Sequence, residues 1–217
     1  MPKGSPERTA ARKDEIIRAC EKLYQTKSFK EITLKDIGNE TSFSRPTIYN
    51  YFQTKEEIFL ALYELEYERW NEDLETILAE NEQLSKKEIA EKIAQSLEKR
   101  AQLLKLLAMN NYDMEESSRE ERLASFKNAY GKSMRNIHAI LDKFCPGMSE
   151  EEKQTFIYAF FPFMFGIYPY TSVTEKQRNA MSEAGVDYRY QTIYELTYRC
   201  LMRLLGEEYK REAKETS

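Results

Sequence analysis

At 217 residues, the chain is long enough for one large domain or for a small domain joined to a larger one. Its 33 Lys and Arg against 37 Asp and Glu give a net charge of −4, which excludes a uniformly basic nucleic-acid-binding protein. Residues 1–55 nevertheless hold eleven Lys and Arg against seven Asp and Glu, a balance of +4, so the remainder carries −8. This asymmetry suits a basic DNA-binding part on an acidic body, with ordinary fluctuation as the alternative.

The three cysteines are scattered and have no metal-ligand spacing. Cys20 and Cys200 fall on apolar helix faces and are interpreted as small buried hydrophobes, whereas a redox role for Cys145 in a predicted loop is the less favoured alternative. No signal peptide opens the chain, and the longest apolar run, residues 156–168, is too short to span a bilayer. We therefore expect a cytoplasmic protein that does not associate with membranes.

The first predicted helix begins after Ser5, a capping residue followed by a proline and an acidic residue, and ends near Thr26. Its inner face carries apolar side chains at helical spacing: Ile16, Cys20, Leu23 and Tyr24. Basic residues near its start are interpreted as part of a solvated face: Arg8, Arg12 and Lys13.

The stretch ITLKDIGNETSFSRPTIYNYFQTKEEIF, residues 32–59, predicts two short helices joined by a turn and followed by a third helix. Turn-forming residues 39–43 end the first helix, Ser44 is placed to cap the second, and Pro46 is tolerated in its first turn. Ile48 and Phe52 face inward. The outward face carries donors, hydroxyls and aromatic rings (Arg45, Thr47, Asn50 and Tyr51), which is the surface that a helix in the DNA major groove requires.

This stretch resembles the helix-turn-helix of the TetR family of bacterial transcription regulators. The matching residues are Thr33, Asp36, Ile37, Ser44, Thr47, Ile48, Tyr49, Tyr51, Phe52, Lys55, Glu56, Glu57 and Ile58, with Ile16, Ile17, Ala19, Leu23, Tyr24 and Phe29 upstream. The sequence departs from the family at Ser28, Gly38, Thr41 and Ser42, where Gly, Ala, Ala and Gly are usual, and at Phe43, which replaces a smaller residue. Serine at position 42 in a left-handed turn would cost up to about 1 kcal/mol relative to glycine.

The predicted fold is all-α, with about nine or ten helices. Residues 1–53 are expected to form a three-helix DNA-binding domain, and residues 54–217 a larger helical regulatory and dimerisation domain. Further helices are predicted at residues 54–80, 85–107 with a break near Arg100, 119–144, 150–168, 174–182 and 188–205. Capping boxes at Thr54, Ser85 and Ser149 open three of them, Gly206 ends the last, and residues 110–118 read as a loop.

The helix predicted at residues 150–168 is apolar on nearly every side, with a kink expected at Pro162. Such a helix must be buried on every side, which calls for a surface beyond the chain's own body. We therefore expect this helix and the last one to pair with their symmetry copies in a homodimer, an intrachain core being the alternative. The predicted interface residues are Phe156, Phe160, Phe163, Tyr194, Tyr198 and Leu201.

A two-fold dimer would present its second helix-turn-helix helices to a near-palindromic double-stranded DNA operator. Arg45 is the candidate for base reading because a guanidinium can bridge guanine O6 and N7. Pro46 and Thr47 offer apolar surface to thymine methyl groups, and Asn50 reaches either an adenine edge or a phosphate. The predicted phosphate contacts are Tyr49, Tyr51, Lys55, Thr33 and Ser44. Partial core packing of the two tyrosines and plain solvation of Lys55 are the alternatives.

The family resemblance implies that one or two of Arg8, Arg12 and Lys13 contact DNA phosphates. It also implies a small-molecule effector bound in the body. Aromatic residues on helices expected to converge are its candidate pocket, with plain core packing as the alternative: Tyr67, Trp70, Tyr112, Phe126, Tyr130, Phe161 and Phe165. An enzyme is not expected, since the one histidine, His138, has no neighbouring carboxylate in the sequence, and no phosphate loop, zinc spacing or nucleophile elbow is present. No cofactor and no metal are expected.

The sequence therefore predicts a DNA-binding transcriptional regulator, in the first place a repressor released from its operator by a small, largely apolar or aromatic ligand. The alternatives are a helical scaffold protein and a DNA-binding regulator without an inducer.

Overall fold

The computed structural model describes residues 5–109 and 111–207, which form eleven helices and no strand. These residues fall into two compact units, one of residues 5–68 with 111–131 and the other of residues 69–109 with 132–207. The helices α4 (Lys55–Glu80) and α8 (Glu120–Phe144) each contribute residues to both units. The all-α prediction is confirmed, whereas a domain boundary between residues 53 and 54 stays a prediction.

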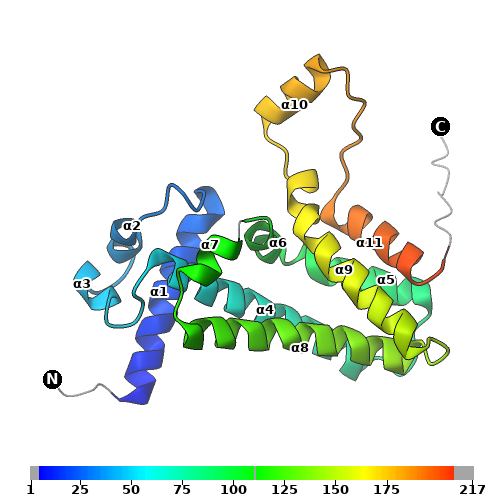
Figure 1. Cartoon of the computed structure of the whole chain (residues 1–217), viewed down its shortest axis with the longest axis horizontal. Coiled ribbons are helices and arrows are strands. Elements are labelled where there is room, and N and C mark those ends of the chain that lie inside the picture. The colour runs from blue at the N-terminus through cyan, green and yellow to red at the C-terminus, as the bar shows by residue number, and fades with distance from the viewer. Residues whose placement is uncertain (1–4, 110, 208–217) are drawn as a thin grey trace. The chain divides into compact units, whose positions relative to one another are not determined.

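The first unit begins with α1 (Pro6–Thr26), α2 (Leu34–Asn39) and α3 (Arg45–Ile48), in which α2 packs against both α1 and α3 (Figure 1). Ser5 caps α1 as predicted, because its hydroxyl accepts a hydrogen bond from the Arg8 amide at 3.3 Å. Apolar side chains at helical spacing form the core of these three helices and the turn after them, and all of the following are fully buried: Ile16, Cys20, Ile37, Ile48 and Phe52.

The turn between α2 and α3 differs from the sequence prediction. None of the described residues other than glycine has a positive φ, so Ser42 is not in a left-handed conformation and carries no such strain. Instead, the Ser42 amide donates to the Glu15 carboxylate on α1, and the Thr41 hydroxyl donates to the Gly38 carbonyl at 2.9 Å. Side-chain hydrogen bonds thus hold this turn without a glycine at position 42.

The two helices that flank this turn begin differently. Thr33 opens α2 with a capping box, in which its hydroxyl accepts from the Asp36 amide at 3.2 Å while the Asp36 carboxylate accepts from the Thr33 amide at 2.9 Å. Ser44 stands at the cap position of α3, but its side chain makes no capping hydrogen bond. The predicted serine cap is therefore wrong, and α3 is a short helix of four residues.

The predicted loop at residues 110–118 is also wrong in part, because residues Asn111–Glu116 form α7. Asn110 lies outside the described residues. A six-residue helix is too short to show an apolar period, and among its described side chains Met114 is buried, at 1% exposed. The helix α8 then ends at Phe144, directly before Cys145 and Pro146, as predicted.

In the second unit, α11 (Ile193–Leu204) packs against α5 (Lys86–Glu98) and α9 (Glu150–Thr171), and α6 (Ala101–Leu107) also packs against α9 (Figure 1). The capping boxes at Ser85 and Ser149 and the break near Arg100 are confirmed. The last helix begins at Ile193 and not at residue 188, because Thr192 and Glu195 form a further capping box. Gly206, with a φ of 75°, follows its end as predicted.

The helix α9 continues through Pro162 and buries one face: Lys153, Phe156, Ile157, Phe160, Phe161, Met164 and Ile167. Its other face leaves Tyr158 67% exposed and Tyr170 58% exposed, so a single chain does not bury this helix on every side. The helix α10 (Glu175–Glu183) stands away from α9 and α11 in Figure 1 and has no buried residue. Among the described helices, none alone has the length and apolarity to cross a membrane; α9 and α10 meet that test only as a pair, bent by 87°.

Candidate DNA-binding surface

The surface that carries the predicted DNA contacts consists of α3 and the turn that follows it. Hydrogen bonds from the Asn50 amide to the Thr47 carbonyl at 3.1 Å, and from the Tyr51 amide to the Ile48 carbonyl at 2.9 Å, extend the ordered backbone beyond α3. Ile48 and Phe52 are fully buried and pack the inner side of this segment against the core. We call residues Ser44–Phe52 the recognition segment; its outward side chains include the exposed Arg45, Pro46, Tyr49 and Asn50 and the half-buried Thr47 and Tyr51.

Arg45 and Tyr49 lie one helical turn apart and contact each other. The Arg45 guanidinium donates to the Tyr49 hydroxyl at 3.1 Å and lies 5.9 Å from the centre of the tyrosine ring. Both residues are exposed, and Tyr49 keeps 46% of its surface accessible. The ring therefore orients an arginine that presents its remaining donors to solvent, and the tyrosine is not part of the core.

Tyr51 is held from the first helix. Its hydroxyl accepts a hydrogen bond from Arg12 of α1 at 3.4 Å, and the Arg12 guanidinium lies 5.6 Å from the centre of the Phe43 ring. Arg12 is thereby placed beside the recognition segment, which brings a second positive charge to the same surface.

The two hydroxyl residues predicted to contact phosphates have partners within the chain. The Thr33 hydroxyl donates to the Asp36 carboxylate at 2.6 Å, and Thr33 lowers the pKa of Asp36 through its side-chain and then its backbone hydrogen bond. The Ser44 and Thr47 hydroxyl oxygens lie 3.3 Å apart. Thr33 and Ser44 are nevertheless exposed at the starts of α2 and α3.

Lys55 requires a correction. Its ammonium group donates to the main-chain carbonyls of Phe29 at 2.8 Å and Ile32 at 3.0 Å, and it lies 3.9 Å from the centre of the Phe29 ring. These contacts direct the charge onto the connection between α1 and α2. We therefore assign Lys55 a structural role; solvation alone does not describe it either.

Two arginines that the sequence analysis missed support the end of the recognition segment. Arg119 and Arg122 donate to the Tyr51 carbonyl at 3.3 Å and 3.5 Å. Arg119 also pairs with Glu57, a fully buried carboxylate, at 2.6 Å. Burial alone would raise the pKa of Glu57, but hydrogen bonds from Arg119 and from the Gln53 amide outweigh it and lower that pKa. No local pattern could reveal this pair, because its members are 62 positions apart.

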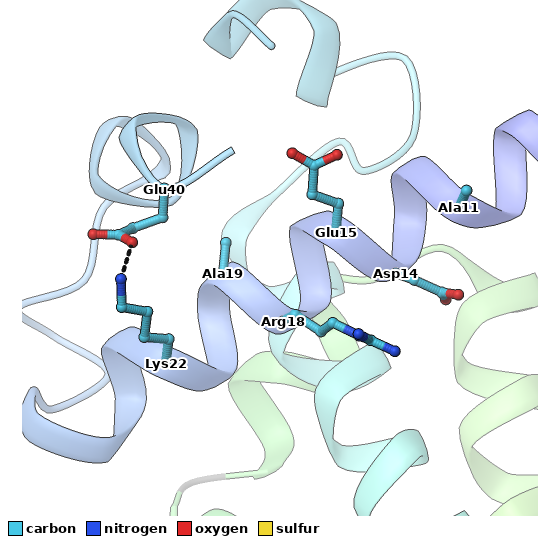
Figure 2. Close-up of a pocket in the computed structure, with 7 residues that line it drawn as sticks. All are labelled: Ala11, Asp14, Glu15, Arg18, Ala19, Lys22 and Glu40. Atoms are coloured by element: carbon cyan, nitrogen blue, oxygen red, sulfur yellow. Dashed lines mark hydrogen bonds and ion pairs between the residues drawn. The ribbon is translucent and has the colours of Figure 1, made fainter. Parts of the chain in front are cut away.

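A groove of about 490 Å³ lies along α1, beside the end of α2, and is shown in Figure 2. It is lined by Ala11, Asp14, Glu15, Arg18, Ala19, Lys22 and Glu40. Lys22 and Glu40 pair across it at 2.6 Å. Three acidic and two basic side chains give this groove no positive charge, so it is not a phosphate-binding surface.

The predicted ligand-pocket residues are distributed over the two units. In the first unit, Tyr67 packs against Phe126 and Tyr130 with ring centres 6.0 Å and 5.5 Å apart, and burial, followed by its Tyr63 and Tyr130 neighbours, raises the pKa of Tyr67. In the second unit, Trp70 and Phe161 are 6.1 Å apart. Phe165 is 39% exposed and Tyr112 is 85% exposed. Tyr112 is therefore removed from the candidate pocket, because its ring lies almost wholly in solvent.

The predicted dimer residues fall into an accessible group and a buried group. Phe163, Tyr194 and Tyr198 keep part of their surface accessible, and the two tyrosine rings stack at 5.7 Å. Phe156, Phe160 and Leu201 are at most 1% exposed within one chain. Their assignment to the interface is corrected, because they belong to the core of the second unit and have no surface to offer a second copy.

His138 has carboxylate neighbours that the sequence analysis missed: Asp142, one helical turn away, at 2.9 Å, and Glu150 at 3.1 Å. The three residues offer atoms within 4.8 Å of one another, the spacing of a metal site. However, the Lys153 ammonium pairs with Asp142 at 2.5 Å and with Glu150 at 2.6 Å. A cation is thus already present between the carboxylates, so this cluster is interpreted as an ion-pair network that joins α8 to α9.

The three cysteines are free thiols. Cys20 and Cys145 are buried and Cys200 is half-buried. Burial raises the pKa of Cys145, although Lys86 acts against it, and burial raises the pKa of Cys200 to about 11. A reactive thiol requires the opposite shift, so the structure gives no support to a redox role for Cys145.

Comparison with known proteins identifies two family models. Residues 16–62 match the model described as bacterial regulatory proteins, tetR family, and residues 64–203 match the model described as tetracyclin repressor-like, C-terminal domain. The HTH-type transcriptional regulator YfiR of Bacillus subtilis, itself uncharacterized, is 36% identical over 63 residues, which are 29% of this chain and 31% of that protein. EthR of Mycolicibacterium smegmatis, another HTH-type transcriptional regulator, is 40% identical over 47 residues, 22% of each chain. The matches thus span less than a third of these two relatives.

Solved structures share the fold over almost the whole chain. FadR of Thermus thermophilus, a transcriptional repressor in complex with lauroyl-CoA, aligns with a TM-score of 0.58 at 20% identity, covering 94% of this chain and 99% of that one. FadR of Bacillus subtilis, in complex with stearoyl-CoA, aligns with a TM-score of 0.57 at 17% identity, covering 90% and 98%. At these identities the likeness shows the fold alone.

Proposed function

Because the chain belongs to the TetR family of bacterial transcription regulators, we propose that it binds a near-palindromic operator as a homodimer and represses transcription until a small ligand releases it. In this proposal, residues 1–53 supply the DNA-binding domain and residues 54–217 the regulatory and dimerisation domain. The observation that carries the proposal is the recognition segment, in which buried Ile48 and Phe52 support an outward surface of arginine, amide and phenol groups.

Arg45 is proposed to read a base, since its guanidinium is exposed and oriented by Tyr49. Pro46, Thr47 and Asn50 are proposed to lie against neighbouring base edges. The phenols of Tyr49 and Tyr51, together with the hydroxyl groups of Thr33 and Ser44, are proposed to contact phosphates and so to fix the register without reading sequence. Arg12, held at the Tyr51 hydroxyl, is added to this phosphate-contacting set.

The decisive experiment is selection of bound DNA from a random pool, which tests binding, symmetry and operator sequence together. On the selected operator, we expect Arg45→Ala to cost about 1–3 kcal/mol and to relax base preference at one position in each half-site. Arg18→Ala is the matched control, since Arg18 is also an exposed arginine of the first unit but lines the acidic groove. An equal loss of affinity for operator and random DNA in Arg45→Ala would refute base reading by Arg45. A protein that selects no DNA would favour the scaffold alternative.

The effector is proposed to be a small molecule with a large apolar or aromatic part. The support is the number of aromatic side chains in the body and the acyl-CoA complexes of the two FadR structures. Lauroyl-CoA and stearoyl-CoA are therefore the first probes. We expect a probe that binds to raise the melting temperature and to lower operator affinity. Absence of both effects across acyl-CoA and aromatic probes would favour a regulator without an inducer.

A further inference from the structure

The end of the recognition segment depends on residues from a distant part of the first unit. A four-residue helix is too short to be stable alone, and the last carbonyl groups of any helix have no partner within it. The Tyr51 carbonyl, just beyond α3, accepts hydrogen bonds from Arg119 at 3.3 Å and from Arg122 at 3.5 Å. The Arg122 guanidinium also lies 5.0 Å from the centre of the Phe52 ring.

Arg119 also holds the residues that follow Tyr51, through Glu57. The Glu57 carboxylate accepts from the Gln53 amide at 2.8 Å, which fixes the backbone directly after Phe52. Arg119 donates to this carboxylate at 2.6 Å through Nε and at 3.0 Å through a terminal nitrogen, and its own amide donates at 3.2 Å. Glu57 is fully buried, and a buried carboxylate without its cation is strongly unfavourable. The position of residues 51–53 is therefore tied to that of Arg119.

We propose that Arg119 is a positioning residue for operator recognition: through Glu57 and the Tyr51 carbonyl, it fixes the end of the recognition segment and thereby the orientation of Arg45 and Tyr49. This inference rests on the proposed DNA-binding function. Base reading by a two-point guanidinium contact depends closely on orientation, whereas attraction to phosphates depends mainly on charge. Loss of the Arg119 contacts must therefore weaken operator binding more than binding to random DNA.

Arg119→Lys is the test variant, because lysine keeps the positive charge and loses the planar two-point contact with Glu57. Arg100→Lys is the matched control: Arg100 pairs with Asp73 at 2.7 Å in the second unit, with a similarly part-exposed side chain. A second variant, Glu57→Met with Arg119→Met, removes both charges together and leaves neither one buried without its partner, so it keeps the test available if the single variant does not fold. Circular dichroism establishes folding.

In Arg119→Lys, we expect operator affinity to fall about tenfold, the effect of losing roughly one base-pair contact, and affinity for random DNA to change less than about threefold. Amide hydrogen exchange of residues 49–53 should become faster in Arg119→Lys and in the double variant, and stay unchanged in Arg100→Lys. Unchanged operator affinity in folded Arg119→Lys, or equal losses on both DNAs, would overturn the proposal, and so would unchanged exchange of residues 49–53.

The two measurements separate this proposal from the function on which it rests. If the wild-type protein selects no DNA, the regulator function fails and the recognition role of Arg119 fails with it, whatever the exchange rates. If the wild type selects an operator and Arg119→Lys keeps the same discrimination, only the positioning role fails.

Discussion

Lys55 shows how the surroundings of a residue decide its role. Its ammonium group donates to the carbonyls of Phe29 and Ile32 and lies over the Phe29 ring, so it joins the start of α4 to the connection between α1 and α2. Two main-chain carbonyls would lose a charged donor if this group were removed.

We expect Lys55→Met to lower the free energy of unfolding by about 1–2 kcal/mol, because methionine keeps most of the side-chain volume and removes the hydrogen bonds. Urea denaturation measures this loss. Lys30→Met is the control, since Lys30 is an exposed lysine of the same unit and its loss should leave stability nearly unchanged. Equal stability of the Lys55 variant and the wild type, together with a shallower dependence of DNA affinity on salt, would restore Lys55 to a phosphate contact.

For single residues, the sequence predicts which side chains face the core better than it predicts the hydrogen-bond partners of polar side chains. Ile48 and Phe52 were predicted to face the core because they recur at helical spacing, and both are fully buried. The partners of Lys55 lie 26 and 23 positions away, and Arg119 lies 62 positions from Glu57. Such pairs depend on how the chain folds back on itself, which a local pattern does not contain.

At the scale of the helices, α2 and α3 each follow a hydroxyl residue at the cap position, but only one of these residues caps its helix. Thr33 caps α2 with a reciprocal pair of hydrogen bonds to Asp36, whereas the Ser44 side chain makes no capping hydrogen bond to α3. We therefore expect Thr33→Ala to lower the free energy of unfolding by about 1 kcal/mol and Ser44→Ala to change it by less than about 0.5 kcal/mol.

Thermal and urea denaturation of the two variants measure the difference, each serving as the control for the other. Equal destabilisation by both changes would mean that Ser44 caps α3 in solution, and no destabilisation in either would mean that the Thr33 capping box contributes nothing measurable.

Helix ends were predictable where a cap has a recognisable spacing, as at Ser85 and Ser149. The predicted start of the last helix, residue 188, is wrong because aromatic residues at Tyr188 and Tyr190 extend the apolar pattern of α11 toward the N-terminus. In the structure these two rings pack against each other at 5.0 Å outside any helix, and Thr192 opens α11 instead. The sequence does contain the Thr192–Glu195 spacing of a capping box, which marks the observed start of α11.

At the scale of the whole molecule, one face of α9 is exposed to solvent in the single chain. Tyr158 is 67% exposed and Phe165 is 39% exposed, and large apolar side chains gathered on one exposed face are uncommon in proteins that act as monomers. Covering them with a second copy would also give the two recognition segments the two-fold symmetry that a near-palindromic operator requires. We therefore expect the wild type to be a dimer at micromolar concentration.

The double change Tyr158→Glu with Phe165→Glu should convert the protein to a monomer, because association would bury two uncompensated negative charges in each copy. Sedimentation equilibrium measures the mass, and the monomeric form should lose most of its operator affinity because it can contact only one half-site at a time. Tyr112→Glu is the matched control: Tyr112 is 85% exposed on α7, and its change should leave the dimer intact. A monomeric wild type would refute the dimer. A double variant that remains dimeric would place the subunit contact away from this face of α9.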